Sequence, residues 1–253
     1  KGEVSMADMP QKRSPQRRRT PYNRTKKSNI KNDSHTLDTK VFALGGLNEV
    51  GKNMYCIEHD DEIIIIDAGV KFAEDGLPGI DYVIPDYSYL KRNQKKIKAL
   101  LITHGHEDHI GGIPFLLQVV HIPFIYASPL ACAMIRRKLE ERRLTQATKL
   151  VQIDNLYQIK TKHFNIGFFK TNHSIPESLG IIVNTPNGRV VATGDFKFDL
   201  TPVGDPADYQ VMSFLGETGV TLLLSDSTNA EVPNFSISEK QVAYSVQEEF
   251  RKT

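Results

Sequence analysis

The chain has 253 residues, of which 40% are hydrophobic and 25% are charged, and its formal net charge is +2. These values lie in the range of ordinary globular proteins and allow one substantial core. No apolar stretch is long enough to span a bilayer, and the chain does not open with a signal-peptide pattern. We therefore expect a soluble, cytoplasmic protein with one main domain and appendages.

The first residues of the chain are strongly basic and poor in apolar side chains. Residues 1–31 carry a net charge of +8, so the remaining residues sum to −6 within the total of +2. Pro10, Pro15, Pro21 and many Ser, Asn and Gln residues deny this segment a core, which predicts a basic disordered tail over residues 1–38. Such a tail could recruit RNA through phosphate contacts, or it could be a solvated terminus that is partly an expression scar.

From residue 40 onward, short apolar runs alternate with polar and glycine-containing segments, which is typical of β-strands. The expected strands cover residues 40–45, 54–58, 62–67, 98–103, 123–127, 149–153, 164–170, 179–184, 189–194 and 221–225. The only two cysteines, Cys56 and Cys132, lie in apolar surroundings far apart in sequence. We expect them to be buried free thiols rather than a disulfide or a metal pair.

Two helices have clear starting signals. One is expected over residues 129–143, with Ser128 as the N-cap and Pro129 at the first helical position. Near the end of the chain, Ser236 and Glu239 have the spacing of a capping box and precede an amphipathic run. Strands and helices together predict a mixed α and β fold.

The densest group of metal-ligand side chains follows the apolar run 98–102. Imidazole nitrogens and carboxylate oxygens form a ligand set that suits zinc and its neighbours in the first transition row. Ligands two residues apart face the same way only on an extended backbone, so this is a strand-end loop rather than a helical histidine pair. The predicted metal site is formed by His104, His106, Asp108 and His109.

Four other predicted strand ends carry side chains that could complete the site. Asp67 ends the strand at 62–67 and could orient a ligand or bind a metal directly. His173 lies just past another strand, and Asp195 follows Gly194 and could bridge two ions with its two oxygens. Asp226 follows the last expected strand. A single Asp after a strand is more often a turn-former or helix cap, but the histidine cluster favours ligand roles here.

These residues carry a resemblance to a known group of proteins. Asp67, HGHEDH at 104–109, His173 and Asp195 resemble the successive motifs of the metallo-β-lactamase superfamily. More narrowly, the chain resembles the bacterial ribonuclease J family, whose members carry an inserted β-CASP domain. The segments that carry this narrower resemblance are GGLNEVGKNM at 45–54, GLPGIDYVIPD at 76–86, NHSIPES at 172–178, TGDFKFD at 193–199 and SDSTN at 225–229.

The resemblance implies an α/β fold, the layered αββα sandwich of the metallo-β-lactamases. Residues 39–229 would form the first part of that domain, and residues 230–253 would begin the β-CASP domain. The eight histidines include none beyond Asp195 to supply the further ligand that the family carries. We therefore expect the chain to be an N-terminal fragment, with the sandwich incomplete.

The resemblance also implies a division of roles within the metal site. One metal ion would be bound by His104, His106 and His173. A second would be bound by Asp108 and His109, and Asp195 would bridge the two. Zn²⁺ is the expected metal, with two ions per site, and Mn²⁺ is compatible with the same ligands.

Other residues would act around the metal ions. The residues expected to serve catalysis are Asp108, Asp195 and Asp67, the last by supporting the metal loop through hydrogen bonds. Substrate contacts are expected from Ser174, Ser178 and Asp226, of which Asp226 matches the first β-CASP motif.

The function implied by the resemblance is a two-metal ribonuclease with 5′-to-3′ exonuclease and endonuclease activity on single-stranded RNA, acting in RNA maturation and decay. Two alternatives stay open: another hydrolase of the same fold, acting on DNA, a thioester or a lactone, and a catalytically incomplete RNA-binding fragment. The expected partners are single-stranded RNA, further copies in a homodimer or homotetramer of the intact protein, and other RNA-decay proteins. No membrane partner is expected.

Overall fold

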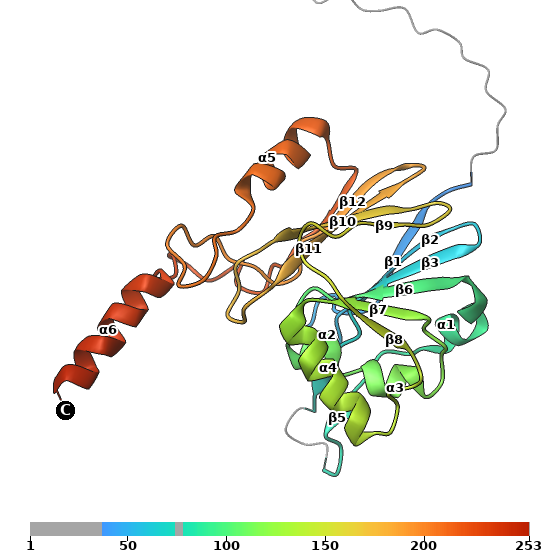
Figure 1. Cartoon of the computed structure of the whole chain (residues 1–253), viewed down its shortest axis with the longest axis horizontal. Coiled ribbons are helices and arrows are strands. Elements are labelled where there is room, and N and C mark those ends of the chain that lie inside the picture. The colour runs from blue at the N-terminus through green and yellow to red at the C-terminus, as the bar shows by residue number, and fades with distance from the viewer. Residues whose placement is uncertain (1–36, 74–77, 253) are drawn as a thin grey trace, which may run out of the picture. The chain divides into compact units, whose positions relative to one another are not determined.

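Two β-sheets face each other, and helices cover their outer faces (Figure 1). This computed structural model describes residues 37–73 and 78–252. The predicted basic tail at 1–38 therefore lies outside the described residues, apart from its last two.

The first sheet has six strands in the order β1-β2-β3-β6-β7-β8. They are Lys40–Gly45, Met54–His59, Glu62–Ile66, Ile97–Leu101, Phe124–Ala127 and Lys149–Gln152. β2 is antiparallel to β1 and β3, whereas β3, β6, β7 and β8 are parallel to one another. Parallel neighbours end at the same edge of a sheet, so the loops that follow β3 and β6 meet there.

The second sheet has five strands in the order β13-β12-β11-β10-β9. They are Leu222–Leu224, Gly188–Ala192, Leu179–Thr185, Asn165–Lys170 and Ile159–Lys160. All of its neighbours are antiparallel except β12 and β13. Two further short strands, β4 at Lys71–Phe72 and β5 at Tyr82–Val83, pair with each other.

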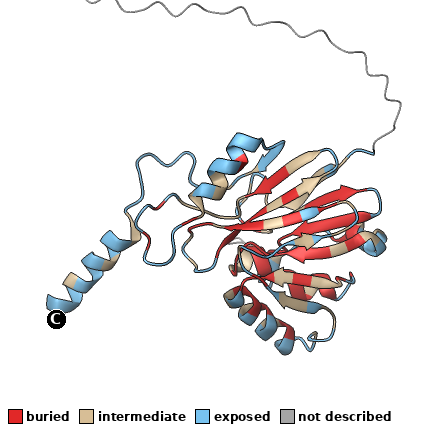
Figure 2. Cartoon of the chain, turned by 45° about the horizontal axis from the view of Figure 1, so that its top comes forward, coloured by how far each residue is buried: buried red, intermediate tan, exposed pale blue. Residues whose placement is uncertain are grey.

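Four α-helices pack against the outer face of the first sheet: α1, α2, α3 and α4. Their bounds are Ser88–Arg92, Glu107–Ile110, Ile113–Leu117 and Pro129–Glu141, and a 3-10 helix, η1, covers Gln94–Lys96. α5, Tyr209–Thr218, packs on the second sheet, and α6, Glu239–Lys252, has no buried residue within its described length (Figure 2). None of the described helices is both long and apolar enough to cross a membrane.

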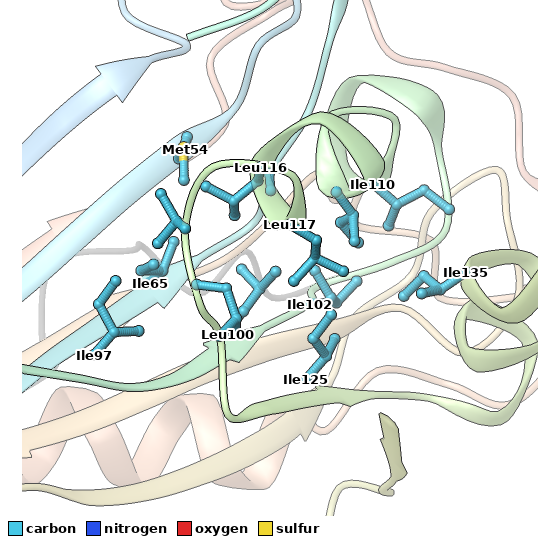
Figure 3. Close-up of a cluster of buried hydrophobic side chains, with 14 of the residues drawn as sticks. Met54, Ile65, Ile97, Leu100, Ile102, Ile110, Leu116, Leu117, Ile125 and Ile135 are labelled. Carbon is cyan, nitrogen blue, oxygen red and sulfur yellow. The ribbon is translucent and has the colours of Figure 1, made fainter. Parts of the chain in front are cut away.

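Strand β3 explains why the core has two layers. Side chains alternate across a strand, so Ile64 and Ile66 pack between the sheets while Ile63 and Ile65 face the helices. All four are at most 1% exposed. Figure 3 shows Ile65 in the helix-side cluster, together with side chains of β6, α3 and α4. Burial of each such side chain contributes about 1.5–3 kcal/mol to folding.

A third, smaller cluster covers the other side of the second sheet. Phe169 of β10 and Val191 of β12 pack there against Leu215 of α5. The described part of the chain is therefore layered as helix, sheet, sheet, helix. This confirms the predicted αββα arrangement.

The beginning of β3 is fixed by a buried carboxylate. Glu62 is 4% exposed and accepts hydrogen bonds from the hydroxyl of Thr161, at 2.5 Å, and from the backbone N–H groups of Lys162 and His163. These donors lie on the turn between β9 and β10. Glu62 therefore connects the two sheets at this end of β3.

The predicted strands are all present, with ends that differ by at most two residues. The helix predicted at 129–143 is α4, and the predicted free thiols Cys56 and Cys132 are both buried. Strands β4, β5 and β9 and helices α2, α3 and α5 were not predicted. The three strands have only two residues each, α2 and α3 have only four and five residues, and α5 lacks a clear starting signal.

The predicted capping box near the end of the chain is wrong. α6 begins at Glu239, two residues later than a capping box with Ser236 as N-cap requires. Its first N–H donates to the Asp199 carboxylate, at 2.8 Å. The helix start is therefore fixed by a residue forty positions earlier in the chain, and not by Ser236.

The two-layer core generates a test. Ile64→Ala should lower the free energy of unfolding by about 2–5 kcal/mol, because it leaves a cavity between the sheets. The control is Leu156→Ala, since Leu156 is 80% exposed; it should change stability by less than about 0.5 kcal/mol. Urea unfolding of both variants measures the difference, and equal midpoints would contradict the assignment of Ile64 to the core.

Candidate metal centre

The predicted ligand residues come together at the edge where β3 and β6 end. Asp67 directly follows β3, and residues 103–109 follow β6. The prediction of a strand-end loop holds for His104 and His106, whereas Asp108 and His109 lie in the short helix α2. The second sheet reaches the same edge, because the backbone N–H of Leu179 at the start of β11 donates to the Thr103 carbonyl at 2.9 Å. His173 follows β10 and Asp195 follows β12. Four strand ends thus supply one site.

Three imidazoles form the first ligand group. His104 Nε2 and His173 Nε2 each lie 3.1 Å from His106 Nδ1. The ligand atoms of all three residues lie within 4.8 Å of one another, which is the spacing of side chains that could share a metal ion.

The second group joins imidazoles to carboxylates. Ligand atoms of His104, His109 and Asp195 also lie within 4.8 Å of one another. His109 Nε2 lies 3.2 Å from Asp195 Oδ1 and 3.4 Å from Asp108 Oδ2. The other oxygen of Asp195 lies 3.7 Å from His173 Nε2, so its two oxygens face the two groups.

Asp67 lies behind the ligands rather than among them. Its carboxylate is buried and accepts from the Thr103 N–H and hydroxyl, each at 2.8 Å. His109 Nδ1 lies 2.7 Å from the same carboxylate. This leaves His109 Nε2 facing Asp108 and Asp195. Of the two roles considered for Asp67, orienting a ligand or binding a metal directly, these contacts favour the first.

The electrostatics of the site suit metal binding. Burial and the neighbouring charge of His109 lower the pKa of His104 to about 2, so the ring is neutral at neutral pH and one of its two nitrogens is free to bind a metal. Burial likewise lowers the pKa of His173. A metal ligand must present an unprotonated nitrogen, and both histidines satisfy this condition at neutral pH.

His109 behaves in the opposite way. Burial on its own would lower its pKa, but the charge of Asp67 and hydrogen bonds to Asp108, Asp195 and Asp67 outweigh burial and raise it well above the usual value. Burial on its own would raise the pKa of Asp195, but the hydrogen bond to His109 and its charge hold it below the usual range in the metal-free protein. A metal ion at His109 Nε2 would displace the proton from this nitrogen. Carboxylates arranged in this way favour a cation at the site.

The sequence analysis missed Asn53. Its side-chain amide lies 3.1 Å from His109 Nε2 and 3.3 Å from Asp108 Oδ2, and its backbone N–H donates to the Asp108 carbonyl. Asn53 directly precedes β2. Asn53 lies within the segment 45–54 quoted for the resemblance, but an Asn at the start of a strand carries no chemical signal of its own, so its contacts emerge only from the fold.

A cavity of about 970 Å³ opens beside the carboxylate side of the site. Asp108, His109 and Asp195 line it, together with Asp226 and the loop 46–51. The Asp226 carboxylate accepts from the backbone and hydroxyl of Thr228. Asp226, where a substrate contact is predicted, thus lines the same cavity as three of the predicted ligands.

The two predicted serine contacts lie elsewhere. Neither Ser174 nor Ser178 is among the described residues that line the cavity. Ser174 is exposed, whereas Ser178 is 2% exposed and its hydroxyl donates to the Ile175 carbonyl at 3.1 Å. The contacts of Ser178 are those of a residue that shapes its own loop, and the substrate role of both serines stays a prediction.

A separate group of ligand-type side chains lies at the start of β3. Asp60, Asp61 and His163 also have ligand atoms within 4.8 Å of one another. Lys162 Nζ lies 3.0 Å from Asp61 and 3.5 Å from Asp60. A lysine thus already neutralises these exposed carboxylates.

The fold and the ligand set are matched by known proteins. Residues 47–241 match the family described as the metallo-beta-lactamase superfamily. The chain belongs to this superfamily. The predicted metallo-β-lactamase fold is thereby confirmed.

The relatives found by sequence carry the name ribonuclease J. Ribonuclease J 1 of Streptococcus pyogenes is 62% identical over 206 residues, which are 81% of this chain and 37% of that protein. Ribonuclease J of Mycoplasma pneumoniae is 52% identical over 204 residues, which are 81% of this chain and 36% of that protein. The predicted resemblance to this family is confirmed, and the chain spans little more than a third of the length of these relatives.

Solved structures support the fold. A protein of unknown function from Enterococcus faecalis V583 has a TM-score of 0.59 at 16% identity, covering 79% of this chain and 52% of its own. Unliganded yeast PDE1 has a TM-score of 0.54 at 14% identity and covers 75% of each chain. At these identities the likeness shows a shared fold alone.

Close packing behind the ligands gives a test. A Cβ at Gly69 would lie 1.6 Å from the Asp108 carbonyl oxygen, so Gly69→Ala must displace the metal loop. We expect it to lower the free energy of unfolding by about 3 kcal/mol or more. Gly167→Ala is the matched control, because nothing lies within 4 Å of its Cβ position. Thermal unfolding of the two variants measures the contrast, and similar melting temperatures would contradict the packing described for this loop.

Proposed function

We propose that this chain carries the catalytic metal site of a ribonuclease that hydrolyses phosphodiester bonds in single-stranded RNA. The observation that carries the proposal is the placement of Asp195 between two ligand groups at the wall of a cavity, in a chain whose relatives are named ribonuclease J. Both 5′-to-3′ exonuclease and endonuclease activity belong to the proposal.

The residues present fit a pair of metal ions. His104, His106 and His173 would hold one ion, and Asp108 and His109 the other, with Asp195 between them. The donors are imidazole nitrogens and carboxylate oxygens, which suit Zn²⁺ and also accept Mn²⁺. We propose Zn²⁺ as the metal. When bound, such ions supply activated water and neutralise charge on phosphoryl oxygens.

The chain's own residues would prepare the site for this chemistry. Asp67 holds the His109 ring in one orientation, and the Asn53 amide limits the movement of Asp108. Asp226, two residues after the end of β13, lines the cavity and would contact the substrate there. The cavity volume lies near the upper end of the range of about 300–1,000 Å³ typical of ligand sites.

Several wider features are part of the same proposal. The metallo-β-lactamase domain would extend over residues 39–229, and residues 230–253, which include α6, would belong to a β-CASP domain. Ser174 and Ser178 would contact the substrate from their loop. The intact protein would act in the cytoplasm as a homodimer or homotetramer, together with other RNA-decay proteins.

A direct test uses a 3′-labelled single-stranded RNA with a 5′-monophosphate. The chain should cleave it in the presence of Zn²⁺ or Mn²⁺, and Asp108→Ala should reduce cleavage to background because a proposed metal ligand is lost. Asp86→Asn is the control, since its side chain bonds only locally to Ser88 N–H. Failure of the parent chain to exceed the Asp108→Ala blank would overturn the proposal for this chain.

Metal content provides a second test, independent of RNA. His106→Ala should lose the ion of the three-histidine group, and Asp195→Ala should lower the occupancy of both ions because its oxygens face both groups. Elemental analysis after Zn²⁺ loading and desalting measures the ratio of metal to protein. Full occupancy in both variants would rule out these ligand assignments.

A further inference from the structure

Helix α4 lies against both loops that carry the three-histidine group. Leu130, Met134 and Lys138 are four residues apart, so they form one stripe along this helix. The adjoining face of the helix, which includes Ile135 and Leu139, is buried in the helix-side cluster of the first sheet, and Met134 packs against the edge of this cluster. α4 is thus fixed to the core along one face and lies against the metal loops along the adjoining one.

The first loop is held at two points of this stripe. Lys138 Nζ pairs with the Glu107 carboxylate at 2.5 Å, and Glu107 lies between His106 and Asp108 in sequence. In Figure 1, helix α2, which begins at Glu107, lies beside α4. A Cβ at Gly105 would lie 2.8 Å from Met134 Sδ. The loop backbone at Gly105 therefore packs on the Met134 side chain, which would have to move to admit a Cβ.

The second loop supplies the cap of the same helix. Glu177, four residues after His173, accepts a hydrogen bond from the Leu130 N–H at 2.7 Å. Ser128 occupies the N-cap position, but its hydroxyl is buried and has no hydrogen-bond partner among the described residues. The carboxylate that satisfies the start of α4 therefore comes from the loop of His173, where it also interacts favourably with the helix dipole.

The backbone at Glu177 indicates that this contact constrains the loop. Its φ is +62°, a left-handed conformation that is uncommon for a residue other than Gly, Asn or Asp. Such conformations persist where surrounding contacts impose them. Ile175 of the same loop lies 3.4 Å from the Gly105 Cβ position, so the two loops also meet each other beside α4.

We propose that α4 sets the spacing between the two loops of the three-histidine group, with Lys138 and Glu177 as positioning residues. Lys138 acts through Glu107, and Glu177 acts through the backbone that follows His173. The inference rests on the proposed function, because it requires that His104, His106 and His173 bind a metal ion. Ligand distances in metal sites vary by only about 0.2 Å, so a small shift of either loop weakens binding.

The test measures Zn²⁺ affinity by competition with a chromophoric chelator, in the whole chain and without RNA. Lys138→Ala and Glu177→Gly should each weaken the binding of one of the two proposed ions by about tenfold. Glu177→Gly removes the carboxylate and at the same time relieves the left-handed backbone. Lys138→Arg should restore binding, because it keeps a charged partner for Glu107.

The control is Arg137→Ala on the same helix. Arg137 pairs with Glu141 at 3.1 Å, but both side chains are largely exposed and the pair touches neither metal loop. Zn²⁺ affinity should equal that of the parent chain. Thermal unfolding of the metal-free proteins checks that every variant folds, and Lys138→Met, which keeps the length of the side chain, replaces Lys138→Ala if the latter does not.

The outcomes separate the two proposals. Parent-like Zn²⁺ affinity in both Lys138→Ala and Glu177→Gly would overturn the positioning role of α4 and leave the metal site standing. An equal loss of affinity in Arg137→Ala would also overturn it, because any weakening of the helix would then suffice. A parent chain that takes up no Zn²⁺ would overturn the proposed function and this inference together.

Discussion

The arrangement of the metal centre depends on one buried carboxylate, that of Asp67. β3 and β6 are parallel neighbours, and Asp67 joins the end of the first to the loop after the second by accepting from Thr103 and His109. A buried carboxylate without donors is costly, so the loop cannot leave the strand without a large loss of stability. The same contacts turn His109 Nε2 toward Asp108 and Asp195. The orientation of the His109 ring therefore depends on the parallel pairing of β3 and β6, which brings Asp67 next to it.

Most of the fold could be predicted because the strands carry local patterns. Runs such as the four isoleucines of β3 can only be buried, and the glycine and proline residues between runs mark their ends. The position of α5 and the start of α6 depend on non-local contacts. α5 is held by Leu215 against the second sheet, and α6 begins where Asp199, far away in sequence, accepts its first N–H. Neither contact can be read from neighbouring residues.

The candidate site divides in the same way. The histidines of the loop 104–109 could be predicted because they are adjacent in sequence and chemically unusual as a group. Asn53, Lys138 and Glu177 could not, since each resembles an ordinary surface residue until the fold brings it to the loops. The resemblance to ribonuclease J supplied roles for Asp195 and His173 that spacing alone left open. Candidate metal ligands are therefore easier to find from sequence than the residues that hold those ligands in position.

The four isoleucines of β3 have a further consequence. Because Ile63 to Ile66 are identical, sliding the strand by one residue would place isoleucine in both cores again, and the apolar pattern cannot by itself oppose such a slip. The two residues at the ends of the strand do oppose this slip. Glu62 and Asp67 are both buried, and each meets three donors that a slipped strand would miss. Two acidic residues, rather than the hydrophobic ones between them, thus select the pairing of the central strand and with it the position of the metal loop.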